Sequence, residues 1–262
     1  MMRPTIGSAI RLMLKPLLLS TCLLLVAIPS HADGLADLKT ALQNLPGQQS
    51  LKASISVKSQ NHQGDEDETI TESGAATLAV EESAQGLLVQ IAPDTLARAQ
   101  AEELAKEEDK KAKAPTSKGL GLLNLSAIRA MTMAGESLKR SIKGSIFKSE
   151  KADTWNGQPA RMLSFEADPS KRSKQDQKYV KSFESSLQVW IAADGTPLES
   201  RTQTKISGRA FLVVSFEMSD ASRVVYQRVG DRLIATRRES SNSGSGMGTK
   251  GEGKTEYTLQ LR

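Results

Sequence analysis

The spacing of hydrophobic residues changes near residue 50. Before that point, four leucines recur at steps of three and four, which puts them on one face of a helix: Leu35, Leu38, Leu42 and Leu45. Pro46 and Gly47 are expected to end this helix. Over residues 51–57 apolar and polar side chains alternate, which is typical of a strand with one buried face. We therefore expect a short helix that lies against a sheet.

The same alternation returns along most of the chain. It predicts further strands over residues 76–80, 87–91, 161–167, 183–191, 198–206, 210–218, 224–229, 233–237 and 257–261. Residues 64–68 are interpreted as a polar hairpin loop, and Asp194 with Gly195 as a hairpin turn. Residues 240–253 are interpreted as a flexible Gly/Ser hairpin loop. Sequential strands joined by tight turns predict an antiparallel meander.

Two segments between the strands have a helical pattern. Residues 95–113 are rich in Ala, Glu and Lys, with oppositely charged pairs at i,i+4 that each add roughly 0.2–0.5 kcal/mol. We interpret residues 94–121 as an exposed charged helical arm followed by a linker from residue 114, without the sustained heptads of a true coiled coil. An amphipathic helix is then expected over residues 125–142, ending near Gly144.

These patterns define an α+β fold class. We expect a large curved antiparallel sheet, an unclosed barrel built as a meander, that is covered by amphipathic helices and carries the charged helical insertion. The chain has 262 residues, and residues 33–262 suffice for a single domain with a sizeable core.

The first 32 residues have the organisation of a cleavable signal peptide. Arg3, Arg11 and Lys15 precede an apolar run over residues 17–28, and small residues lead to a predicted cut between Ala32 and Asp33. An uncleaved anchor is one alternative, but the run is shorter than the roughly 20 residues that span a bilayer. A lipoprotein signal that ends at Cys22 is another, but Thr21 is a poor residue before such a cut. We expect export to a bacterial periplasm and a soluble product.

Cleavage changes the chemistry that composition suggests. The formal net charge of +5 falls to +2 in the mature chain, and its basic residues are interspersed with acids, so a nucleic-acid partner is not expected. The only cysteine, Cys22, lies within the signal peptide. The mature protein therefore has no disulfide, no thiol nucleophile and no cysteine metal ligand.

One segment matches the G-x-x-x-x-G-K-[ST] pattern of a phosphate-binding loop: Gly248, Gly253, Lys254 and Thr255. Such a loop needs a helix that starts at its lysine. Residues 256–262 instead alternate like a strand and end the chain, so no bound nucleotide is expected.

Other candidate chemistry is sparse in the mature chain. His62 lies near an acidic run at residues 65–68, but this run lacks the spacing of a calcium loop, and we expect neither a metal nor a cofactor. A nucleophile system would have to use His62, the single histidine left after cleavage. Paired carboxylates for glycoside chemistry stay open, although nothing singles out a pair. The protein is therefore expected not to be an enzyme.

The order of elements and one hairpin carry a resemblance to a known family. Six residues match a "W-I-x-x-D-G-x-P" strand and hairpin together with the preceding position: Val189, Trp190, Ile191, Asp194, Gly195 and Pro197. In this respect the chain resembles the periplasmic outer-membrane lipoprotein carrier family. The resemblance implies an unclosed barrel covered by helices, whose apolar concavity receives acyl chains. The pocket of that family is rich in aromatic residues, whereas aromatic residues make up only 4% of this chain.

We therefore expect a non-enzymatic periplasmic module that binds an apolar ligand, a lipid or a lipoprotein acyl chain, between the sheet and the helix at 125–142. Candidate ligand-binding residues are Ile128, Met131, Leu138, Leu187, Val189, Leu212 and Val214. The alternative is an envelope protein that contacts a protein partner through its charged arm. A hydrolase is a third interpretation.

Overall fold

The structure is a computed structural model that describes residues 33–262 except 66–68, 172–178, 211–213 and 247. The expected signal peptide, residues 1–32, lies outside the described residues.

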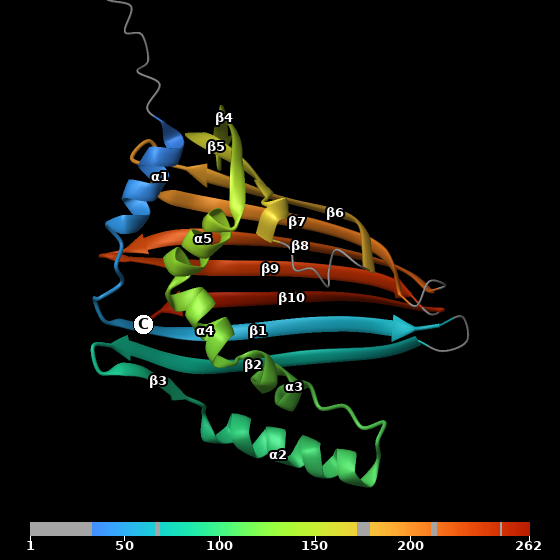
Figure 1. The fold of residues 1–262 in the computed structure, drawn as a ribbon. Helices are drawn as coiled ribbons and strands as arrows, with labels where there is room; N and C mark the ends of the chain where they lie inside the picture. Colours follow the sequence, from blue (N-terminus) through green and yellow to red (C-terminus); the bar gives the residue numbers. More distant parts are fainter. Residues whose placement is uncertain (1–32, 66–68, 172–178, 211–213, 247) are drawn as a thin grey trace, which may run out of the picture. The chain divides into compact units, whose positions relative to one another are not determined.

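The described residues form one antiparallel sheet of ten strands, in the order β3-β2-β1-β10-β9-β8-β7-β6-β5-β4 (Figure 1). The strands are β1 (Leu51–Gly64), β2 (Thr69–Ser83), β3 (Gly86–Gln90), β4 (Ser145–Trp155), β5 (Gln158–Ala167), β6 (Val180–Ile191), β7 (Pro197–Ala210), β8 (Val214–Val229), β9 (Arg232–Gly246) and β10 (Thr249–Leu261). Each strand pairs with the next along the chain within β1–β3 and within β4–β10, and β1 pairs with β10 to join the two series. The sheet is not closed, since β3 and β4 are its two edges. The predicted α+β class with an unclosed antiparallel sheet is confirmed.

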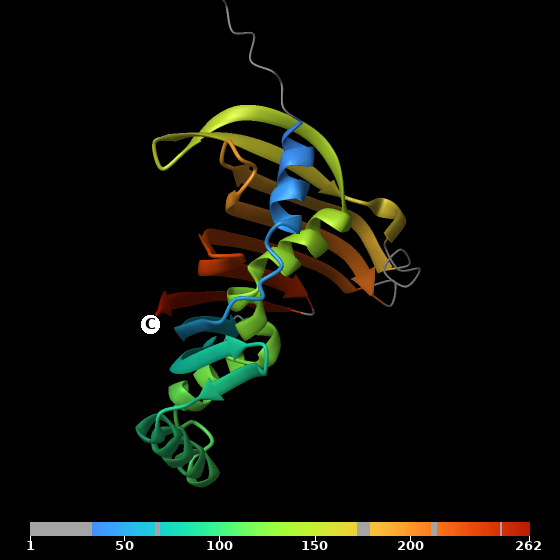
Figure 2. The same cartoon turned by 90° about the vertical axis from the view of Figure 1, so that its left-hand side faces the viewer.

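Helices cover part of one face of this sheet. The helices are α1 (Gly34–Gln43), α2 (Pro93–Glu108), α3 (Pro115–Leu122), α4 (Leu125–Thr132) and α5 (Ala134–Lys143), with a 3₁₀ turn at Pro169–Lys171. Helices α1, α3, α4 and α5 contact strands, whereas α2 packs mainly against α3. In Figure 1, α1, α4 and α5 lie in front of the sheet, and the strands extend well beyond them. Figure 2 shows β4 arching over α1.

The first helix forms where the leucine spacing predicts it. Asp33 caps α1, because its carboxylate accepts hydrogen bonds from the backbone N–H groups of Leu35 and Ala36. The turn between β6 and β7 packs against this helix: a Cβ on Gly195 would lie 2.4 Å from the backbone oxygen of Asp37. Gly195 also has φ +82°, so only glycine fits the Asp194–Gly195 turn without strain.

The hydrophobic core lies between the helices and the covered half of the sheet. The alternation over residues 51–57 buries one face of β1, as expected: Ala53, Ile55 and Val57 are buried. Opposite them on β2 lie Val80, Leu78 and Ala76 in register. Leucines of α1 and side chains of α4 and α5 complete this core.

Three expectations about the helices are wrong. The linker expected from residue 114 is largely a helix, α3, which begins at Pro115 and whose first free N–H groups, on Thr116 and Ser117, donate to the carboxylate of Glu102. The charged helix ends at Glu108, earlier than expected. The helix expected over residues 125–142 is two helices, because Met133, with φ −127° and ψ 50°, interrupts the helical backbone.

The strand expectations also need correction. Strand β4 was not predicted, because most of this edge strand is exposed and its side chains show little alternation. Residues 210–218 do not form one strand: β7 ends at Ala210, β8 begins at Val214, and these two residues pair. The Gly/Ser segment at 240–253 is mostly strand, in β9 and β10, because pairing with strands on both sides overrides its weak intrinsic preference.

Candidate functional site

Five of the seven predicted ligand-binding residues lie in the hydrophobic core. Ile128, Met131, Leu138, Leu187 and Val189 are all buried within one cluster of packed side chains. Leu212 lies outside the described residues, and nothing is described of the side chain of Val214, the first residue of β8. The five core residues do not line the apolar groove described next.

A groove of about 480 Å³ lies beside this core, between α1, α5 and the ends of β4 and β5. Its lining residues are Leu35, Lys39, Leu42, Gln43, Lys139, Ile142, Lys143, Ser145, Phe147 and Phe165. Apolar side chains come from both helices and both strands, while most of the polar ones are on the helices. We call this feature the apolar groove.

Two aromatic rings contribute to the wall of the apolar groove. Phe147 of β4 and Phe165 of β5 are paired across the two strands, with ring centroids 5.5 Å apart in an edge-to-face arrangement. Such a pair adds about 0.5–1.5 kcal/mol beyond the area it buries. Phe165 is fully buried and Phe147 partly so, which gives the groove a firm aromatic side next to the core.

Polar contacts hold β4 against α1 and so fix the groove. The carboxylate of Glu150 accepts a hydrogen bond of 3.0 Å from the backbone N–H of Gly34. Arg161 of β5 donates to Asp37 of α1 at 2.7 Å and also lies 3.5 Å from Glu150. The contacts of Glu150 with Gly34 and of Arg161 with Asp37 join residues more than one hundred positions apart, and they position the arch of β4 over the helix.

Three lysines stand among the lining residues of the apolar groove. Lys139 forms an ion pair with Glu136, one turn earlier on α5, at 2.7 Å. Lys39 and Lys143 are exposed and form no ion pair with any described residue. The groove therefore combines an apolar interior with amines at its surface, which suits a ligand that is itself amphipathic.

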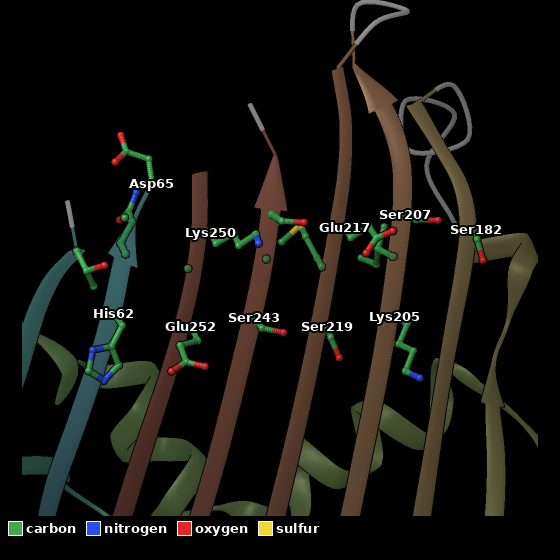
Figure 3. A pocket seen from close by; sticks show the side chains of 18 of the residues that line it. His62, Asp65, Ser182, Lys205, Ser207, Glu217, Ser219, Ser243, Lys250 and Glu252 are labelled. Carbon is green, nitrogen blue, oxygen red and sulfur yellow. The ribbon is translucent and has the colours of Figure 1, made fainter. Parts of the chain in front are cut away.

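A second, larger hollow lies on the face of the sheet away from the helices, as Figure 3 shows. It measures about 860 Å³, and a row of side chains crosses it from β1 to β7: His62, Glu252, Ser243, Ser219 and Lys205. The neighbouring row carries Lys250, Ser245, Glu217 and Ser207. We call it the polar hollow. It presents hydroxyls and charges of both signs, an arrangement typical of a solvated sheet face.

The hairpin that carries the family resemblance has a structural role here. Glu199, with a side chain only 1% exposed, accepts hydrogen bonds from Arg223, Trp155 and Arg201. Burial favours the neutral form, but these donors outweigh it and lower the pKa of Glu199 to about 2. The indole N–H of Trp190 donates to Asp153, and the Arg201 guanidinium lies 4.8 Å from the Trp190 ring centroid.

The phosphate-loop pattern lies on a strand. Gly253, Lys254 and Thr255 belong to β10 and pair with β1 and β9, so no helix starts at the lysine.

Near the acidic run, Nδ1 of His62 shares a hydrogen bond of 2.9 Å with the hydroxyl of Thr71. Residues 66–68 lie outside the described part. Across the residues that the structure does describe, no group of three His, Cys, Asp or Glu side chains could hold a metal.

Comparisons with known proteins add no assignment. The chain matches no protein-family model, and no curated protein is similar to it. None of the helices in the described part of the chain is both long and apolar enough to cross a membrane.

Sequence reasoning identified only part of the apolar groove. The leucine spacing of α1 includes Leu35 and Leu42, and the helix expected over residues 125–142 includes Ile142. The aromatic pair was missed because β4 itself was missed. The signal that the sequence did offer was the pair of apolar residues Ile146 and Phe147, which follows soon after the helix-ending Gly144.

Proposed function

We propose that the exported domain is a non-enzymatic module that binds an apolar ligand, the acyl chain of a lipid or of a lipoprotein. The observation that carries the proposal is the apolar groove, a space of about 480 Å³ beside the core. Ligand sites typically measure roughly 300–1,000 Å³ and are mostly apolar with a few polar groups.

The size and lining of the apolar groove favour one acyl chain. A volume of about 480 Å³ holds about sixteen groups the size of a water molecule at roughly 30 Å³ each, comparable to a long single chain. Each methylene removed from water contributes about 0.8 kcal/mol. In the apolar groove the ligand would lie beside α5 and contact Ile142 and Phe147. It would not contact the five residues that the sequence predicted as ligand-binding and that lie in the core.

The apolar probe N-phenyl-1-naphthylamine tests this proposal, because its fluorescence rises when it leaves water. Protein refolded from denaturant, to remove bound lipid, should enhance the fluorescence saturably. Ser145→Trp should abolish most of the enhancement, since Ser145 lines the apolar groove and an indole would fill it.

The matched control is Ser149→Trp, an exposed position on the same strand that does not line the groove. It should bind the probe like the wild type. No saturable enhancement by the wild-type protein, or equal loss in both variants, would contradict the proposal.

The second candidate function is contact with a protein partner in the envelope through α2. Leu96 and Leu104 on this helix are 50% and 54% exposed, which favours an interaction surface. In a pull-down from an envelope extract, Leu96→Ser together with Leu104→Ser should remove a bound protein without loss of helicity. An unchanged set of bound proteins would rule this function out.

A further inference from the structure

We infer that the apolar groove selects amphiphiles with one acyl chain and an anionic head group, which its lysines bind. This inference rests on the proposed function and adds the chemical class of ligand. The shared chemistry is a carboxylate or a phosphate at the end of the chain.

Positive charge dominates the lining of the apolar groove. All three ionisable side chains that line it are lysines: Lys39 on α1, and Lys139 and Lys143 on α5. Two acids lie near these lysines, and each is paired: Glu136 with Lys139, and Asp168, whose backbone N–H donates to the carbonyl of Gly144, with Lys171. The amines of Lys39 and Lys143 form no ion pair with the described residues, so the surface of the groove has a positive excess.

The positions of these lysines place them on both sides of the apolar groove. Leu35 and Lys39 are four residues apart on α1, as Lys139 and Lys143 are on α5, so each pair lies along one helix face. An acyl chain against Phe147 and Ile142 would leave its head group at the surface between the helices. Lysine acts there as a flexible, hydrated point charge with three donors, which suits carboxylate and phosphate alike.

The test compares three ligands with the same chain and different head groups: palmitate, palmitoyl lysophosphatidate and neutral monopalmitoylglycerol. Binding is measured by displacement of N-phenyl-1-naphthylamine from the full mature chain, below the critical micelle concentration of each ligand. At least one anionic ligand should bind about tenfold more tightly than the neutral one, the factor that about 1.4 kcal/mol gives. Preference for palmitate would assign a carboxylate, and preference for lysophosphatidate a phosphate; either supports the inference.

The variant Lys39→Gln/Lys139→Gln/Lys143→Gln should lose that preference, so that the anionic ligands bind no more tightly than the neutral one. The control Lys110→Gln/Lys111→Gln/Lys113→Gln makes the same change in net charge on exposed residues after α2, and it should keep the preference. Raised salt should weaken anionic binding in the wild type, since surface charges are screened.

The head-group inference and the proposed acyl-binding function would be refuted by different results. If the neutral ligand binds as tightly as both anionic ligands, the head-group inference is wrong and the acyl-binding function stands. If no ligand displaces the probe and the probe itself does not bind, the proposed function is wrong.

Discussion

Phe147 and Phe165 pack edge to face, with ring centroids 5.5 Å apart, at the point where the apolar groove meets the core. The pair joins the edge strand β4 to β5, so a substitution in either ring should affect both the stability of the arch and the shape of the groove.

A double-mutant cycle measures this contact. Phe147→Leu and Phe165→Leu should each destabilise the protein, and the coupling between them should be about 0.5–1.5 kcal/mol, because each removes the same aromatic contact. Urea unfolding of the wild type, both single variants and the double variant gives this value. If the losses in unfolding free energy of the two single variants add up to that of the double variant, the two rings contribute no interaction energy.

A glycine should be required where α3 meets β2. A Cβ on Gly119 would lie 2.4 Å from the carbonyl carbon of Ala75, so Gly119→Ala should cost roughly 1–3 kcal/mol in unfolding free energy through overpacking. The control is Gly121→Ala in the same helix, where nothing lies within 4 Å and the better helix propensity of alanine should stabilise by up to about 1 kcal/mol. Similar effects of the two substitutions on urea unfolding would refute the close contact.

A buried ion pair of a β2 carboxylate should contribute far more to stability than an exposed ion pair of the same strand. Arg232 and Glu82 are joined at 3.2 Å with side chains 4% and 10% exposed. Arg232→Met should cost about 3–5 kcal/mol, because the carboxylate of Glu82 would stay buried without its cation. Lys52→Met, which breaks the exposed pair with Glu81, should cost less than about 1 kcal/mol. Thermal unfolding compares the two variants, and equal costs would contradict this difference.

Acid should destabilise the protein partly through Glu199. Its pKa is lowered from 4.5 to about 2 in the folded state, so its contribution to stability is present above pH 4.5 and is lost as the pH falls toward 2. The contribution at pH 7 should be on the order of 2 kcal/mol, allowing for solvent near the two exposed arginines. Glu199→Gln should lose it.

The measurement is the free energy of unfolding at several pH values. The difference between wild type and Glu199→Gln should be constant from pH 7 to about 5 and should shrink toward pH 2. A difference that is independent of pH over this interval would show that the carboxylate is not held ionised by its neighbours.

The sequence predicted the parts of the fold in which one periodicity dominates. The leucines of α1 and the alternation in β1 indicated a helix on a half-buried sheet, and both are present. The Asp194–Gly195 turn was also predictable, because its glycine has the positive φ that such turns favour.

Other parts depend on tertiary pairing and could not be predicted. Strand β4 lies at an exposed edge, with charges such as Lys148 and Glu150 that protect edges and also hide the strand pattern. The apolar groove depends on contacts such as Gly34 with Glu150, which are 116 residues apart. Periodicity within one segment predicts which face of a helix is apolar, but it does not predict which strand will arch over that helix.

The most direct test of the account locates an acyl chain on the protein. Stearate with a nitroxide label on its chain broadens nearby amide signals in an ¹H–¹⁵N NMR spectrum. Our account predicts loss of the signals of Ile142 and Phe147, with those of Ser219 and Ser243 in the polar hollow unchanged. Broadening centred on the polar hollow, or no localised broadening at a saturating concentration, would contradict it.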